Sequence, residues 1–97
     1  MRANRLDSNQ PQIVAALRAR GCFVQVLNAV KDGCPDLLVI HAGERHLLEV
    51  KDGAKVPSKR RLTPDEQAWH DDAARAGYRV PVVQSAGEAL RAVGLNP

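Results

Sequence analysis

The sequence is poor in three features that mark specialised classes of protein: cysteines, aromatic residues and long apolar runs. Only two of its 97 residues are cysteines. That is too few for a disulfide-stabilised scaffold, and without an export signal we expect both to be free thiols. No apolar run approaches the roughly 20 residues of a membrane helix, and the N-terminus has no secretory signal. We therefore expect a cytoplasmic protein without a membrane partner.

Aromatic residues are equally scarce, with one Trp, one Tyr and one Phe. This argues against binding that stacks single-stranded bases on aromatic side chains. The content of 44% hydrophobic and 26% charged residues is ordinary for a folded chain. We expect a single domain over 1–97, with a flexible arm at 1–8 and a basic loop at 52–62. So small a chain buries a modest core, and a partner subunit would add stability.

Helix and strand signals alternate along the chain and predict an α/β fold with a mixed sheet flanked by helices. Residues 63–66 (Thr-Pro-Asp-Glu) form a capping box at a helix start, and residues 85–88 repeat this pattern. Pro81 cannot donate a sheet hydrogen bond, which favours an edge position or a bulge for the last strand. The expected order is α-β-β-β-α-β-α, with helices at 9–20, 63–76 and 85–93 and strands at 22–27, 36–41, 45–51 and 78–84.

The two middle strands form a hairpin that brings Asp36 close to Glu49 and Lys51. With a two-residue turn at Gly43 and Glu44, Asp36 lies opposite Lys51, and the three polar side chains share one face. A three-residue turn would instead place Asp36 and Glu49 on opposite faces. Chemistry that uses all three side chains therefore requires an even number of turn residues, or a bulge.

Asp36 and Glu49 then form a pair of carboxylates that repel each other unless a cation lies between them. Hard oxygen ligands select magnesium or manganese, and a lysine beside the metal can position a water or balance charge on a phosphate. The group suits phosphodiester hydrolysis. The alternative is that Asp36 begins a turn and that Glu49 and Lys51 are a surface pair. The location favours a site, because α/β sheets place their sites at the ends of buried strands.

Three segments have the order and content of a known motif set: Gly-Cys-Pro-Asp-Leu-Leu-Val at 33–39, Leu-Glu-Val-Lys at 48–51 and Leu-Thr-Pro-Asp-Glu-Gln-Ala-Trp-His at 62–70. Together they resemble the VRR-NUC branch of the PD-(D/E)XK nucleases. The resemblance extends over nearly the whole chain, and its motifs are made specific by the glutamine on the helix that follows. It implies a restriction-endonuclease-like core.

The resemblance also implies roles for single residues. Asp36 and Glu49 would be metal ligands, and the carbonyl of Val50 would be a third. Lys51 would be the catalytic lysine, and Gln67 would match the family's helix glutamine, which orients the site. The family often adds an acid on the first helix, for which the nearest candidate in this chain is residue 7, an aspartate.

Stand-alone phage and bacterial members of this kind resemble structure-specific endonucleases, including homodimeric Holliday-junction resolvases. The resemblance therefore implies a magnesium- or manganese-dependent enzyme that cuts branched DNA, such as a Holliday junction or a flap, in a bacterial host. It implies a homodimer and no organic cofactor. Two alternatives stay open: a non-catalytic DNA-binding module or subunit on the same fold, and an enzyme for another phosphorylated substrate.

A basic segment at 51–61 supports a phosphate partner independently. It carries five positive side chains and one negative one, a net charge of +4, against +3 for the whole chain. Such a run is commonly a solvated loop, but this one leaves directly from the candidate strand. Its cations would track a nucleic-acid backbone and make binding depend on salt. Besides Lys51 they are Lys55, Lys59, Arg60 and Arg61.

The remaining candidates are weaker. We expect Trp69, at helical spacing with Ala73 and Ala76, in the core. His70 is either near the site or an ordinary surface histidine, and Cys34 before a proline is expected as a structural thiol. The cysteines and central histidines lack the short Cys-X-X-Cys spacing of structural zinc sites, so we expect no zinc.

Overall fold

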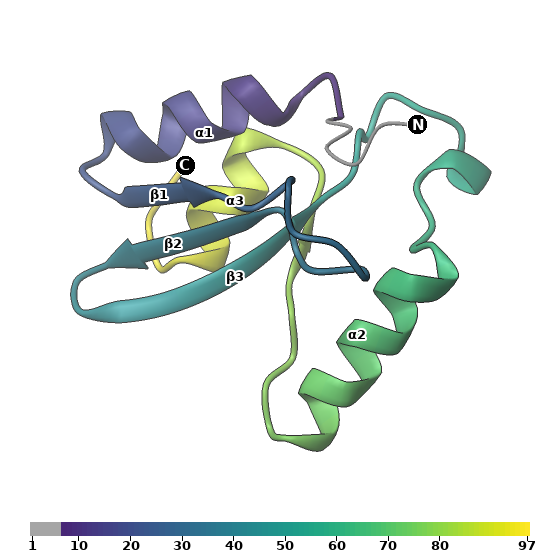
Figure 1. Cartoon of the computed structure of the whole chain (residues 1–97). Coiled ribbons are helices and arrows are strands. Elements are labelled where there is room, and N and C mark those ends of the chain that lie inside the picture. The colour runs from purple at the N-terminus through teal and green to yellow at the C-terminus, as the bar shows by residue number, and fades with distance from the viewer. Residues whose placement is uncertain (1–6) are drawn as a thin grey trace.

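The computed structural model describes residues 7–97 (Figure 1). The arm expected at 1–8 lies largely outside the described residues. Within them, no helix is long and apolar enough to cross a membrane. The predicted order α-β-β-β-α-β-α is confirmed, with one short 3-10 helix added in the basic loop. The elements are α1 (Gln10–Ala19), β1 (Phe23–Val26), β2 (Leu37–His41), β3 (Glu44–Val50), η1 (Pro57–Lys59), α2 (Pro64–Arg75), β4 (Val82–Val83) and α3 (Ala86–Ala92).

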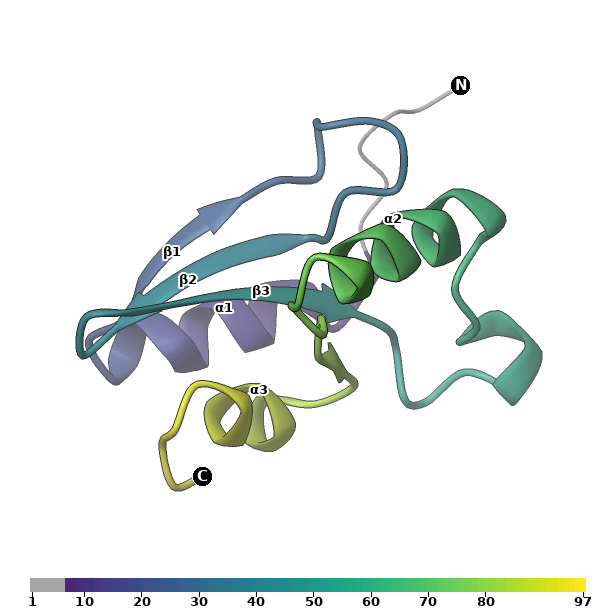
Figure 2. The same ribbon diagram turned by 90° about the horizontal axis from the view of Figure 1, so that it is seen from below.

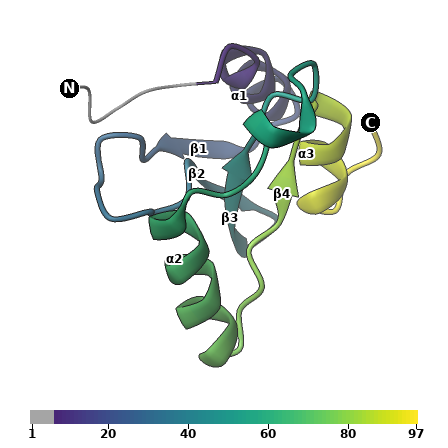
Figure 3. The ribbon, with the colours of Figure 1, turned by 90° about the vertical axis from the view of Figure 1, so that its right-hand side faces the viewer.

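The four strands form one mixed sheet in the order β1-β2-β3-β4. Strand β2 is antiparallel to both of its neighbours, β1 and β3, and β4 runs parallel to β3 after the crossover through α2. Figure 3 shows β4 at the edge of the sheet, beside β3. The edge position expected from Pro81 is therefore confirmed.

The β2–β3 hairpin turns through two residues, as the shared face requires, but one position earlier than the turn considered from the sequence. Ala42 (φ 52°) and Gly43 (φ 80°) occupy the turn, and His41 pairs with Glu44. Two consecutive positive φ angles match the right-handed twist of the flanking strands. Because both turn residues move back by one, the partner of each residue on β2 moves by two positions along β3, and every side chain keeps its face.

One face of the sheet is covered by α1 and α3 (Figure 1), and the residues between them form an apolar core. Alternate strand residues point into it, as the period of two requires. Leu17 of α1, Leu37 and Val39 of β2, and Leu48 and Val50 of β3 are fully buried there, with Ala89 of α3. This apolar core is the main source of the stability of the domain.

Helix α2 covers the other face only at the end of β3 (Figure 2). Its capping box is present as predicted: the Thr63 side chain accepts from the Glu66 amide, and the Glu66 side chain accepts from the Thr63 amide. None of its residues is buried, so the expectation that Trp69 is a core residue was wrong. Trp69 is half-buried because α2 extends past the strands instead of lying across them.

The last strand is much shorter than the stretch 78–84 expected from the sequence, since only Val82 and Val83 pair with β3. Earlier in this stretch a side chain replaces the backbone: the Tyr78 hydroxyl accepts a hydrogen bond from Leu47 N at 2.8 Å and donates to Leu47 O at 3.4 Å. The cap of α3 also differs from the expected box, because the Glu88 carboxylate accepts from Gln84 N and not from the cap residue.

Candidate active site

Asp36 lies immediately before β2 and is held by two hydrogen bonds. Its Oδ2 accepts from the Val50 amide at 2.7 Å, and its Oδ1 accepts from Asn28 Nδ2 at 2.8 Å. Asn28 is fixed in turn by Gln10 of α1, whose Nε2 donates to the Asn28 amide oxygen at 2.6 Å. Gln10 is 2% exposed. A chain of amides from the first helix therefore sets the orientation of this carboxylate.

Glu49 on β3 is fully buried, and its two oxygens have different surroundings. Oε1 is 3.1 Å from His70 Nε2, whereas Oε2 is buried without a hydrogen-bond partner within residues 7–97. Burial, followed by the nearby Asp36 carboxyl, raises the pKa of Glu49 to about 10. Burial also raises the pKa of Asp36. In the absence of a cation, the pair therefore holds a proton at neutral pH.

The backbone beside Glu49 directs the polar groups of Val50 toward the Asp36 carboxyl group. Glu49 N donates to Pro81 O at 2.9 Å and Lys51 N donates to Val83 O at 3.0 Å, so both of these residues point their amides toward β4. Val50, between them, points its amide the opposite way, toward Asp36. Because the N–H and C=O of one strand residue share a side, the Val50 carbonyl also lies on the Asp36 side.

Lys51 follows directly and is 8% exposed. Its Nζ is 2.8 Å from Glu66 Oε1, across the gap between the strand end and the first turn of α2. Burial alone would lower the pKa of the lysine, but the hydrogen bond and charge of Glu66 outweigh it and hold that pKa above its ordinary value. The structure thus brings Asp36, Glu49 and Lys51 together at one end of the sheet.

Gln67 is not brought to this place. It is exposed, and its amide donates to Asp71 Oδ1 at 2.9 Å on the outer surface of α2. The residues of α2 that reach the site are Glu66 and His70. They are four positions apart and so share one helix face, whereas Gln67 lies about 100° around the helix from Glu66. The capping box was the sequence signal that gave Glu66 a fixed position, but it did not reveal the contact with Lys51.

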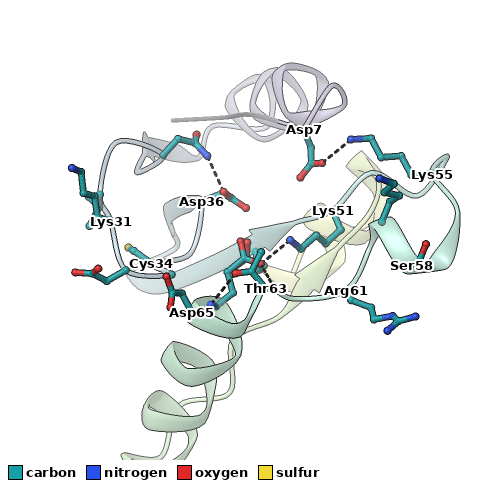
Figure 4. A pocket seen from close by; sticks show the side chains of 17 residues that line it. Asp7, Lys31, Cys34, Asp36, Lys51, Lys55, Ser58, Arg61, Thr63 and Asp65 are labelled. Atoms are coloured by element: carbon teal, nitrogen blue, oxygen red, sulfur yellow. Dashed lines mark hydrogen bonds and ion pairs between the residues drawn. The ribbon is translucent and has the colours of Figure 1, made fainter. Parts of the chain in front are cut away.

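These side chains open into a pocket of about 710 Å³ (Figure 4). In the figure, Asp36, Lys51 and Asp7 extend into it from different elements. Asp7 is the candidate acid before the first helix, and its Oδ1 is 3.5 Å from Lys55 Nζ. It lines the pocket beside the pair but is engaged by the basic loop.

Most of the basic residues of the loop line the pocket, whereas one contacts the rest of the protein. Lys55, Lys59 and Arg61 line the pocket on one side. Arg60 does not line it; its Nη1 donates to the Gln84 side chain at 3.3 Å and ties the loop to the end of β4. A further cation lies on the opposite rim: Lys31, in the loop before β2, was not singled out from the sequence. In the sequence this lysine belongs to a Lys-Asp-Gly segment, which predicts a turn and gives no indication of a binding site.

The donors at the pair suit a divalent cation that binds oxygen. Magnesium takes one or two carboxylates and keeps several waters. Asp36 and Glu49 supply two carboxylates, and the unpartnered Oε2 of Glu49 is the kind of buried atom that a cation would satisfy. Residues 7–97 contain no cluster of three or more His, Cys, Asp or Glu side chains able to hold a metal, and both cysteines are free thiols. The donor set fits magnesium or manganese and offers nothing typical of structural zinc.

Comparison with known proteins gives one clear result. No protein-family model matches the sequence, and no curated protein matches it. A solved structure described as a "VRR_NUC domain" is similar over 90% of this chain and 96% of its own, with a TM-score of 0.61 and 23% sequence identity. The chain therefore has the α/β fold of a VRR_NUC domain, as its motifs predicted.

Proposed function

We propose that the protein is a divalent-metal-dependent DNA endonuclease that hydrolyses phosphodiester bonds. The observation that carries the proposal is the meeting of the Asp36 and Glu49 carboxylates with Lys51 at one end of the sheet, where Glu49 Oε2 is buried and unpartnered within residues 7–97. The fold of a VRR_NUC domain, whose name denotes a nuclease, supports the same assignment.

Each side chain has a role that follows from its place. Asp36, Glu49 and the Val50 carbonyl would hold Mg²⁺ or Mn²⁺, which when bound polarises the phosphate and activates a water. The amide chain through Asn28 keeps the Asp36 carboxylate oriented toward the end of β3. Lys51 presents a positive charge beside the carboxylates, where negative charge grows on a phosphate during attack.

The rims of the pocket suit a DNA backbone. Lys55, Lys59 and Arg61 line one side and Lys31 lines the other, so the phosphates of a strand would meet cations on both sides. The chain has almost no aromatic surface for stacking bases. Recognition by shape and phosphate position follows, and we propose branched DNA, a Holliday junction or a flap, as the substrate.

The test is cleavage of linear, flap, splayed-arm and four-way DNA with Mg²⁺ or Mn²⁺. The Glu49→Gln variant should cleave none of them while still binding DNA. Glu44→Gln is the matched control, since Glu44 is exposed at the far end of the same strand, and it should cleave normally. Salt-dependent binding by a wild type that cuts no DNA would contradict the endonuclease and favour a non-catalytic DNA-binding module.

We also propose that the protein acts as a homodimer, because the two cuts that resolve a junction need two active sites. Support comes from Phe23, which is 56% exposed on edge strand β1, on the face of the sheet that α2 leaves open. Sedimentation at micromolar concentration should give a dimer for wild type and for Val56→Glu, a control at an exposed loop valine. Phe23→Glu should be monomeric. A wild type found only as a 10.5 kDa species would contradict the proposal.

A further inference from the structure

Lys51 has a specific partner, and the proposed roles of Asp36 and Glu49 as metal ligands do not explain it. Its ammonium is largely removed from water, with the side chain 10% exposed, and it lies 2.8 Å from Glu66 Oε1. A buried ammonium needs a fixed acceptor, because water no longer satisfies it. Without such an acceptor, the flexible four-carbon side chain would adopt several conformations. The position of Nζ relative to Asp36 and Glu49 therefore depends on what holds it.

Glu66 is well suited to fix that position, because its own side chain is already held. The same Oε1 atom accepts from the Thr63 amide at 2.9 Å, and Thr63 Oγ1 accepts from the Glu66 amide at 3.2 Å. This reciprocal cap locks the side chain onto the first turn of α2. Gly33 brings that turn to the site: it has φ +82°, and a Cβ there would overlap the backbone of Asp65 and Glu66.

We propose that Glu66 is the positioning residue for Lys51: the α2 cap carries a carboxylate that holds the lysine ammonium at the Asp36–Glu49 pair. This inference rests on the nuclease function proposed above. Glu66 acts through the lysine and does not itself touch the reacting phosphate. Helix α2 thereby becomes part of the active site through its first turn, although none of its residues is buried.

The second cap of the chain provides a matched control. At the start of α3, Ser85 Oγ accepts from the Glu88 amide at 3.2 Å, and Glu88 Oε1 accepts from Gln84 N at 2.8 Å. Glu88 thus supports a helix start as Glu66 does, but it contacts no lysine among the described residues. Glu88→Gln measures the cost of altering such a cap. Glu66→Gln adds to that cost the loss of the charge beside Lys51.

The first experiment compares the two variants in cleavage of branched DNA with Mg²⁺. Glutamine serves in a capping box as glutamate does, so Glu88→Gln should keep the wild-type Tm, and Glu66→Gln should lose only the stability that the contact with Lys51 contributes. We expect kcat to fall about 10- to 100-fold in Glu66→Gln with an unchanged Kd for DNA. Losses of this size are typical of residues that orient an active-site side chain without contacting the substrate. Glu88→Gln should be normal. Equal losses in both variants, a normal kcat in Glu66→Gln, or a loss confined to Kd would overturn the proposal.

The second experiment uses the metal-free protein and no DNA, so it stands even if the nuclease function fails. Ammonium protons of lysine are visible by heteronuclear NMR only when a hydrogen bond slows their exchange. This experiment uses leucine, because the glutamine carbonyl can still accept a hydrogen bond from the lysine. The Lys51 ammonium signal should be present in wild type and in Glu88→Leu and should be lost in Glu66→Leu. A signal that survives in Glu66→Leu would show that another group holds the lysine and would overturn the proposal.

Discussion

The two faces of the sheet are built in opposite ways, although the same strands supply both. On the face under α1 and α3, Leu48 and Val50 of β3 lie in an apolar core. On the face toward α2, Glu49 and Lys51 are also buried but end in ionisable groups. Stability and chemistry are thus separated by the alternation of a single strand.

The difference shows what each face contributes. Buried methyl groups stabilise the fold because they leave water. A buried carboxyl costs free energy unless it is paired, and one Glu49 oxygen has no partner in residues 7–97. The α1–α3 face therefore stabilises the domain, and the buried polar groups on the α2 face, at the candidate site, lower its stability. The predictions below test this division.

The largest loss of stability should come from the α1–α3 face. Leu48→Ala removes a side chain that is fully buried and should lower the free energy of unfolding by about 2–5 kcal/mol. The neighbouring change Glu49→Leu should leave stability equal or higher, because it removes a buried polar group. Urea denaturation of both variants measures this contrast. A Glu49→Leu protein as unstable as Leu48→Ala would show that the faces are not divided as described.

The contact between α2 and the loop before β2 should give the next largest effect. Gly33 and Gly21 both have positive φ, but a Cβ at Gly21 meets nothing within 4 Å, whereas one at Gly33 overlaps Asp65. Alanine at either position costs about 1–2 kcal/mol of backbone strain. At Gly33, overpacking adds about 1–3 kcal/mol or displaces α2. Thermal melts and cleavage assays should therefore find Gly33→Ala impaired in both respects and Gly21→Ala only slightly less stable.

Stability should also depend on pH through Glu49. In metal-free protein its pKa is raised from 4.5 to about 10, so the folded state keeps a proton that the unfolded chain has released. Stability is complete below about pH 4.5 and falls as the pH rises toward 10, by at most about 1.4 kcal/mol per pH unit for one proton. Denaturation in EDTA over this range should show the slope in wild type. The Glu49→Gln variant should show a flatter profile; an identical slope would assign the effect elsewhere.

The smallest effect should come from the body of α2. Trp69→Ala should cost about 1–2 kcal/mol, against about 3–5 kcal/mol for a tryptophan in a packed core, because Trp69 keeps part of its surface exposed. Far-ultraviolet circular dichroism during urea denaturation measures this cost. A loss as large as that of Leu48→Ala would mean that α2 packs more tightly than its exposure indicates.

The sequence predicted the features that depend on neighbours along the chain. The period of two placed Asp36, Glu49 and Lys51 on one face, and the even turn that this requires is present. The capping box at Thr63 is formed as expected. The position of the turn was off by one, because Gly43 can occupy either turn position in a two-residue hairpin and only the paired strands decide which.

Features that depend on how α2 is rotated against the sheet could not be predicted in the same way. Glu66, Gln67 and His70 are adjacent on the helix, and local periodicity does not say which of them faces β3. The rotation of α2 depends on contacts between segments far apart in the sequence, such as the close approach of Gly33 to the backbone of Asp65, 32 residues later. For the same reason Trp69 looked like a core residue.

The Tyr78 hydroxyl has a consequence for the behaviour of the protein in crowded solution. Because β4 pairs with only the end of β3, the N–H and C=O of Leu47 would otherwise be free to recruit a strand from another molecule. The phenol occupies both groups at once. One side chain thus occupies the backbone groups that β4 leaves unpaired on β3, and we expect it to reduce aggregation through this edge of the sheet.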